Sequence, residues 1–167
     1  MADYQDRIAR GLVVNNFTVY GGYVYKKLVN GDKTNGIDVL TKDTQESTNA
    51  SNFLQSNYKC KQFDKYIGKI NLVCPYGREK VYVNIYNGWP KSENRIFKLQ
   101  YKLVDSIPTI VNSDSNEKEC AETIKHIEKR EYWSWDAMRS KDLKYFQKWT
   151  DLNSFPYNMK KYFWHFN

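Results

Sequence analysis

The alternation of apolar and polar residues predicts several strands interrupted by helices. The run 79–86 puts valine and isoleucine side chains on one side and Tyr82, Asn84 and Tyr86 on the other. The sequence Pro75-Tyr-Gly77-Arg78 before it is typical of a hairpin turn. The predicted strands are 16–20, 37–40, 67–74, 79–86 and 96–104, with 107–111 leading away from the last.

Helical spacing of apolar residues accounts for much of the remaining chain. Val24 and Leu28 lie four apart and predict a short helix after a glycine pair. The other predicted helices are one ending at Val14, one over 47–57 capped by Ser47, one starting after Asp114 with Cys120, Ile124 and Ile127 inward, and two over 134–150 and 157–166. We expect an α+β fold: a mixed sheet of about four or five strands over 1–111, flanked by helices, and a C-terminal helical extension over 112–167.

Composition favours an anionic partner without identifying one. The 167 residues carry 26 basic and 19 acidic side chains, a net charge of +7, which suits nucleic acid, a nucleotide or an acidic protein surface. The basic residues are spread along the chain without a polybasic run, and an ordinary solvated surface explains them equally well. No apolar signal segment or membrane-length apolar run is present, so we expect a protein without a membrane span.

The three cysteines, Cys60, Cys74 and Cys120, are odd in number and widely spaced. This pattern fits neither a disulfide framework nor a zinc site, and the chain holds two histidines. We therefore expect no disulfides, buried thiols that act as small apolar groups, and a reducing compartment.

A glycine turn and a lone aspartate are the strongest candidates for chemistry. Gly21 and Gly22 end a strand and precede a helix, where backbone amides can approach a phosphate and Lys26 and Lys27 could bind it. Asp38, on the next strand, could ligate a magnesium ion that bridges this phosphate. Alternatively, the glycines only form a turn and the carboxylate only makes a structural hydrogen bond.

The block Gly-Gly-x-Val-x-x-x-Leu-x-x-Gly, followed by Asn-x-Ile-Asp-Val, resembles the head domain of the nucleotidyltransferase superfamily, in particular bacterial poly(A) polymerases and CCA-adding enzymes. The resemblance covers residues 17–40, and a compatible hairpin continues to about residue 87. It implies a minimal nucleotidyltransferase fold in which a glycine turn and strand carboxylates hold a nucleotide and magnesium.

The chain departs from the family pattern at the metal ligands. The family's Arg-Asp after the glycines is Tyr25-Lys26 here, and the first aspartate of its Asp-x-Asp pair is Gly36. The position of a third carboxylate is best matched by Asn84, whose amide lacks the charge that a divalent ion requires. These losses argue against phosphoryl transfer.

Three other acidic residues could in principle replace a lost ligand. Asp43 lies beyond the strand end, Asp64 lies in a connection without a clear pattern, and Glu79 is far along its strand from Asn84. None is well placed by its position in the sequence.

Aromatic and basic residues concentrate near the C-terminus. Trp133, Trp135, Arg139 and Lys141 could belong to a packed helical seam, a protein interface or a base-stacking surface, in that order of preference.

The leading hypothesis is a catalytically degenerate nucleotidyltransferase-fold protein that acts as a binding or structural component. The alternatives are an active magnesium-dependent nucleotidyltransferase that uses Asp38 to modify nucleic acid or protein, and a nucleic-acid-binding module without catalysis. The Lys-, Asn- and Tyr-rich composition resembles proteins of low-GC large DNA viruses. That resemblance implies the host cytoplasm or the virion as the location, and otherwise we expect a cytoplasmic protein.

Overall fold

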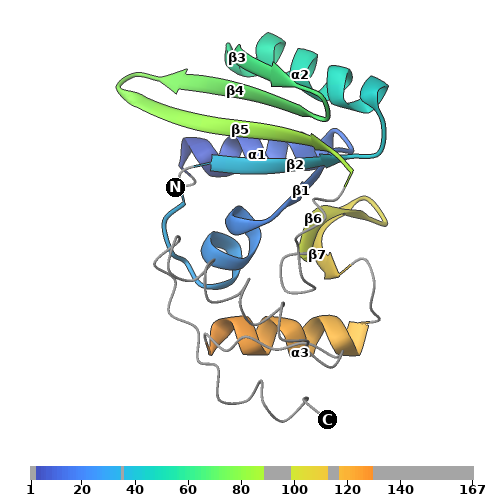
Figure 1. Cartoon of the computed structure of the whole chain (residues 1–167). Helices are drawn as coiled ribbons and strands as arrows, with labels where there is room; N and C mark the ends of the chain where they lie inside the picture. Colours follow the sequence, from blue (N-terminus) through green and yellow to red (C-terminus); the bar gives the residue numbers. More distant parts are fainter. Residues whose placement is uncertain (1–2, 35, 89–98, 113–116, 130–167) are drawn as a thin grey trace, which may run out of the picture.

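One mixed sheet of seven strands organises the part of the chain that the computed structural model describes, residues 3–34, 36–88, 99–112 and 117–129 (Figure 1). The strand order is β3-β4-β5-β2-β1-β6-β7, and all neighbours are antiparallel except β2 and β5. The strands are β1 (Thr18–Tyr20), β2 (Gly36–Thr41), β3 (Lys61–Tyr66), β4 (Lys69–Tyr76), β5 (Glu79–Asn87), β6 (Leu99–Val104) and β7 (Ile107–Asn112). The α+β class is confirmed, but the expectation of four or five strands is wrong because β3 and β7 also pair into the sheet.

The described residues also form four helices beside the sheet: α1 (Tyr4–Val14), the π-helix η1 (Tyr23–Val29), α2 (Thr44–Tyr58) and α3 (Glu117–Glu128). The expected cap at Ser47 is wrong, because Asp43 caps α2 by accepting a hydrogen bond from the Glu46 amide at 2.8 Å. In η1, Val24 is buried whereas Leu28 is 36% exposed. The buried residues of η1 are instead the consecutive Tyr23, Val24 and Tyr25 at its start, so the predicted packing is correct for Val24 and wrong for Leu28.

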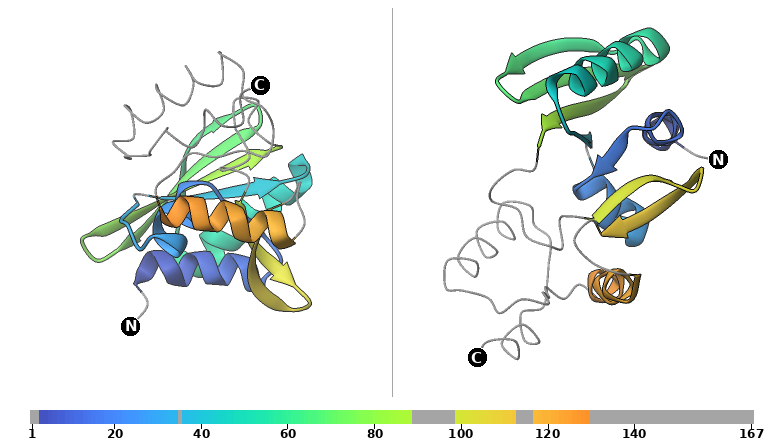
Figure 2. Two further views of the ribbon diagram at one scale, coloured as in Figure 1. Left: turned by 90° about the horizontal axis from the view of Figure 1, so that it is seen from below. Right: turned by 90° about the vertical axis from the view of Figure 1, so that its right-hand side faces the viewer.

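The two faces of the sheet differ in chemistry. α1 and α2 lie over the same face (Figure 2), and the apolar residues of β2, β4 and β5 point toward them. In register across these strands are Ile37 and Val83, Val39 and Ile85, and Leu72 and Val83, all buried. The alternation predicted for β5 is confirmed, so Tyr82, Asn84 and Tyr86 belong to the opposite face.

α3 packs against β7 and η1. The predicted inward stripe on this helix is confirmed, with Cys120 and Ile127 buried and Ile124 partly buried. Most of the predicted C-terminal extension, residues 130–167, lies outside the described residues. In the described part of the chain, no helix combines the length and apolarity that a membrane crossing would need.

Cys60 and Cys74 form a disulfide, so the expectation of no disulfides is wrong. β3 pairs antiparallel with β4, and the Lys61–Val73 register brings the two cysteines opposite each other at a Cα–Cα distance of 4.0 Å. The prediction failed because β3 was not recognised as a strand. Without β3, the separation of 14 residues gives no reason to pair the two thiols.

The disulfide closes a short loop and should stabilise the hairpin that it joins. Replacing both cysteines by serine should lower the free energy of unfolding by about 3 kcal/mol, because the unfolded chain regains the entropy of that loop. Urea denaturation with and without dithiothreitol measures this loss. The reductant should destabilise the wild type and leave the double variant unchanged, and an equal response of both proteins would contradict the assignment.

Candidate functional site

The register of three strands brings Asp38 next to the glycine turn and Asn84. Tyr20, which directly precedes Gly21, pairs with Asp38 across β1 and β2, and Asp38 pairs in parallel with Asn84 across β2 and β5. The Asn84 Nδ2 atom donates a hydrogen bond to Asp38 Oδ1 at 3.2 Å. Gly21 has φ +74°, and a Cβ atom there would lie 2.8 Å from Asp38 Oδ2. Glycine is therefore required at position 21 by both its conformation and the carboxylate.

Asp38 sits in an environment that opposes its ionisation. Burial raises the pKa of Asp38 to about 6, although the hydrogen bond from Asn84 and the positive charge of Lys69 both lower it. At mildly acidic pH, the Asp38 carboxyl group is therefore neutral in a substantial fraction of the protein molecules.

Gly36 lies where the backbone of β5 leaves no space for a side chain on β2. It pairs with Tyr82, and a Cβ atom on Gly36 would lie 2.6 Å from the Tyr82 carbonyl oxygen. Any side chain at position 36, including the aspartate of the family pattern, therefore requires the two central strands to move apart.

Asn71 extends the polar row by one strand and was not predicted as a site residue. It pairs with Asn84 across β4 and β5, is 8% exposed, and its Oδ1 atom has no hydrogen-bond partner among the described residues. The turn predicted over 75–78 would have paired Asn71 with Tyr82, whereas the strands continue to Tyr76 and Glu79 and pair Asn71 with Asn84. A row of two amides and one carboxyl, Asn71–Asn84–Asp38, thus crosses β4, β5 and β2.

The two lysines predicted to bind phosphate differ in their surroundings. The Lys26 side chain passes beside Gly22, where its Cδ atom lies 3.9 Å from the position that a Cβ atom on residue 22 would take. Burial lowers the pKa of Lys26, and Asp32 opposes this shift. The structure therefore brings Lys26, but not the amine of Lys27, close to the glycine turn.

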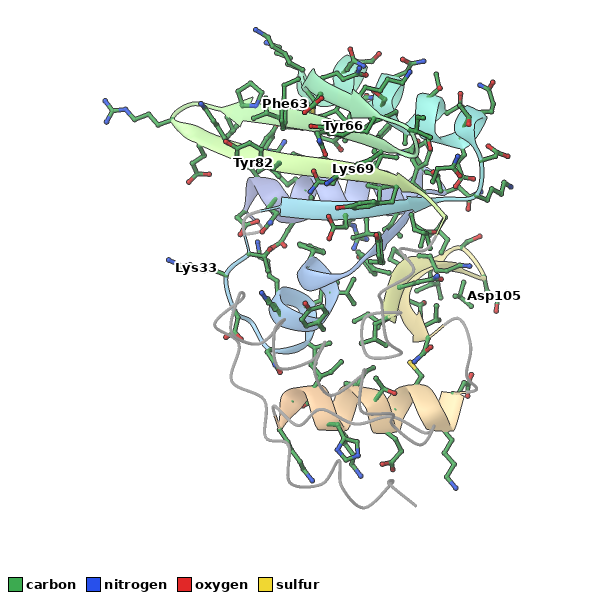
Figure 3. All side chains as sticks on the ribbon, in the orientation of Figure 1. Lys33, Phe63, Tyr66, Lys69, Tyr82 and Asp105 are labelled. Atoms are coloured by element: carbon green, nitrogen blue, oxygen red, sulfur yellow. A yellow bond between two sulfur atoms is a disulfide. The ribbon has the colours of Figure 1, made fainter. Side chains whose placement is uncertain are left out.

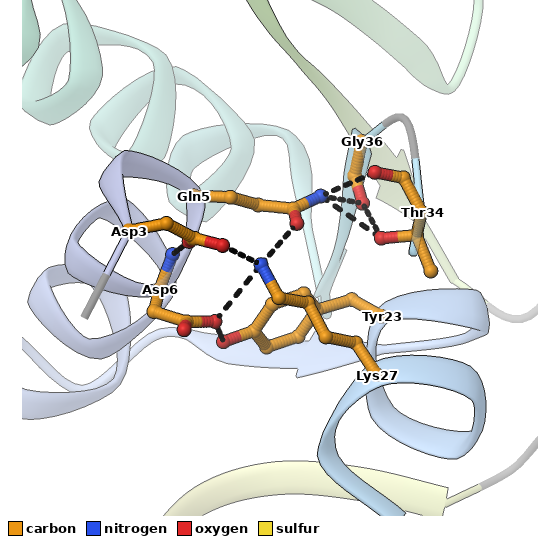
Figure 4. Close-up of polar contacts among 7 residues, drawn as sticks. All are labelled: Asp3, Gln5, Asp6, Tyr23, Lys27, Thr34 and Gly36. Atoms are coloured by element: carbon orange, nitrogen blue, oxygen red, sulfur yellow. Dashed lines mark hydrogen bonds and ion pairs between the residues drawn. The ribbon is translucent and has the colours of Figure 1, made fainter. Parts of the chain in front are cut away.

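Lys27 instead joins η1 to the start of α1 (Figure 4). Its Nζ atom lies 2.5 Å from an Asp3 oxygen, 3.3 Å from an Asp6 oxygen and 2.7 Å from Gln5 Oε1. The Tyr23 hydroxyl donates to Asp6 at 2.7 Å in the same cluster. With its amine held by these acidic and amide groups, Lys27 has a structural role in placing the glycine turn against α1.

An open groove of about 840 Å³ borders this region. Gly36, Tyr82 and Asn84 line it at the sheet, and the start of α1 and the loop after η1 line the other side. Its basic residues, Lys27, Lys33 and Lys80, are matched by three acidic ones, Asp3, Asp32 and Glu79. The groove therefore reaches the polar row at Asn84 without a charge preference for phosphate.

The other acidic candidates lie apart from Asp38. Asp43 caps α2, and Glu79 begins β5 at the hairpin turn. Asp64, on β3, accepts a hydrogen bond from the Tyr66 hydroxyl. Across residues 3–34, 36–88, 99–112 and 117–129, no group of three or more His, Cys, Asp or Glu residues could hold a metal ion. Trp133, Trp135, Arg139 and Lys141 lie outside the described residues.

No family model and no curated protein sequence matches this chain. The similarity to nucleotidyltransferases therefore depends on the motif in residues 17–40 and on the geometry around it.

Replacing Gly21 by alanine should destabilise the fold more than the same change at Gly31, which has a similar φ of +71° but open space around it. The Gly31→Ala variant should lose about 1 kcal/mol through backbone strain alone. Gly21→Ala should lose about 2–4 kcal/mol, because the new methyl group also displaces the Asp38 carboxyl group. Urea denaturation of both variants measures the difference, and equal losses would show that the contact with Asp38 is unimportant.

The raised pKa of Asp38 should make stability depend on pH. The folded state holds the Asp38 proton more tightly than the unfolded chain, so this contribution is complete below pH 4 and is lost as pH rises through about 6. Asp38→Asn cannot titrate. The stability of this variant relative to the wild type should therefore rise by about 2–3 kcal/mol between pH 4 and pH 7.5. A pH-independent difference in urea denaturation would contradict the raised pKa.

Proposed function

We propose that this chain is a nucleotidyltransferase-fold protein that has lost nucleotide transfer and acts as a binding or structural component of a larger assembly. The order of β1, glycine turn, η1 and β2, with β5 parallel to β2, supports the fold assignment. The side-by-side placement of Asp38 and Asn84 supports the correspondence with the family's ligand positions.

The main support for the loss of nucleotide transfer is the lack of space for a side chain at Gly36. Magnesium-assisted phosphoryl transfer uses two or more carboxylates to hold the ion and orient the phosphate. At position 36 the Tyr82 carbonyl oxygen excludes a side chain, and at position 84 an amide replaces the charge. The residues present therefore do not fit a catalytic magnesium ion.

The remaining carboxyl group has a structural use that accounts for its retention. Asp38 Oδ1 accepts from Asn84, and Oδ2 lies against Gly21, so the group connects the two central strands to the glycine turn. The cytoplasmic or virion location and the viral origin remain predictions from composition.

Isothermal titration of the purified chain with magnesium and each nucleoside triphosphate tests the proposal. We expect no metal-dependent binding in the micromolar range and no transfer of labelled nucleotide to RNA, DNA or protein. Metal-dependent transfer that disappears in Asp38→Ala would instead establish the active-enzyme alternative.

Asn84→Asp should partly restore a cation site, because it places a second carboxylate beside Asp38. We expect this variant to bind Mn²⁺ at least about tenfold more tightly than the wild type, as followed by Mn²⁺ electron paramagnetic resonance. Asn84→Gln is the matched control and should not gain affinity. Gly36→Asp should lose stability without gaining Mn²⁺ binding, since its side chain meets the β5 backbone. A folded Gly36→Asp variant that binds Mn²⁺ tightly would contradict the claim that the β5 backbone leaves no room for a carboxylate at position 36.

A further inference from the structure

Three aromatic side chains are exposed on the sheet face opposite α1 and α2, over β3 and β5 (Figure 3). Phe63 and Tyr66 are each 58% exposed, and Tyr82 is 43% exposed. A bulge in β3 between Gln62 and Asp64 turns Phe63 toward Tyr82, and their rings meet edge to face with centroids 6.2 Å apart. We call Phe63, Tyr66, Tyr82 and the residues between them, Lys69 and Asn71, the aromatic face. Contiguous exposed aromatic residues of this kind indicate a binding surface.

The charge around the aromatic face suits a polyanion. The segment 61–80 carries five basic residues and two acidic ones. Lys69 lies on the face itself, with its Nζ atom 5.1 Å from the centroid of the Tyr86 ring. The Asp64 carboxylate is already hydrogen bonded to the Tyr66 hydroxyl at 2.5 Å and to the Lys65 amide at 2.9 Å.

Asn71 adds a hydrogen-bond acceptor without a partner. It lies between β3 and β5 on this face, opposite Asp64 and Asn84. Its Oδ1 atom is buried and accepts no hydrogen bond from the part of the chain that the structure describes. An unsatisfied buried acceptor of this kind destabilises the free protein, but the atom has almost no accessible surface for a ligand to contact.

We propose that the aromatic face binds single-stranded nucleic acid. Unpaired bases stack on Phe63, Tyr66 and Tyr82, and Lys69 contacts the phosphates together with the other basic residues of segment 61–80, except Lys65. A duplex is excluded from this mode because its bases stack on one another. None of these residues is one of the candidate metal ligands. The test of nucleic-acid binding is therefore independent of the test of the proposed loss of nucleotide transfer.

Fluorescence anisotropy of the full chain with labelled RNA and DNA strands of about 12 nucleotides tests the proposal. We expect binding at low salt that weakens steeply as salt increases. The Phe63→Ala/Tyr82→Ala variant should bind at least about tenfold more weakly, since each stacked base contributes about 1–3 kcal/mol. Single strands should bind more tightly than the matching duplex, whose bases are already stacked on one another.

The same hairpin provides matched controls on its other face. Tyr76 is exposed like Tyr82 but stacks on Tyr4 of α1 with centroids 4.4 Å apart, so Tyr76→Ala should leave binding unchanged. Lys65 pairs with the core residue Ile70 and projects to the helix side, whereas Lys69 pairs with Tyr66. Lys69→Gln should therefore weaken binding and reduce its salt dependence more than Lys65→Gln. Thermal unfolding confirms that each variant is folded.

Several outcomes would overturn the proposal. These are no binding at low salt, equal affinity for duplex and single strand, and wild-type affinity in Phe63→Ala/Tyr82→Ala. If no strand binds and the wild type self-associates while the double variant stays monomeric in sedimentation velocity, the aromatic face is a protein interface instead.

Discussion

The structure depends on the parallel pairing of β2 with β5. This pairing joins the β3-β4-β5 hairpin region to β1, β6 and β7, and it is the one parallel contact in the described sheet. Its register puts Ile37 and Val39 beside Val83 and Ile85 in the core under the helices. The same register puts Asp38 beside Asn84 on the other face, so the core and the candidate site are two consequences of one alignment.

Close approach of these two strands also limits the chemistry. At Gly36 the β2 backbone is so near the Tyr82 carbonyl oxygen that a Cβ atom has no room. An additional carboxylate at that position therefore conflicts with the pairing that forms the core. If the proposed nucleotidyltransferase assignment holds, this constraint explains why Gly36 stands where the family pattern has its first aspartate, because an aspartate there requires a rebuilt β2–β5 contact.

The sheet face opposite the helices holds two different surfaces. Near β2 it presents the polar row that ends at Asp38, which is partly buried and linked to the glycine turn. Toward the β3 edge it presents exposed aromatic side chains, with Lys69 paired opposite Tyr66. A protein that has lost phosphoryl transfer could retain nucleic-acid binding through the second surface, because stacking and phosphate contacts need no metal ion.

Much of the fold was predictable from periodicity, and the failures have local physical causes. β4 and β5 alternate clearly because one face is buried, and their turn sequence fixes the hairpin. β3 is almost entirely exposed and contains a bulge, so it shows no such alternation. The disulfide was missed as a direct result.

For the candidate site, the sequence was sufficient to identify Asp38 and Asn84, since both lie on regular strands. Other features of the site depend on contacts between distant segments. The role of Lys27 required knowing that α1 begins at Tyr4 and presents Asp3 and Asp6 to η1. The glycine at 36 was visible as a departure from the family pattern, but its physical reason, the distance between two backbones, was not.

The ¹³C resonance of the Asp38 carboxyl group, followed by NMR as pH is raised, tests the single-carboxylate site most directly. Without metal, this group should titrate near pH 6, and millimolar Mg²⁺ should leave its midpoint unchanged. A midpoint that falls by one pH unit or more when Mg²⁺ is added would show that the carboxylate binds the ion, and would contradict the loss of the metal site.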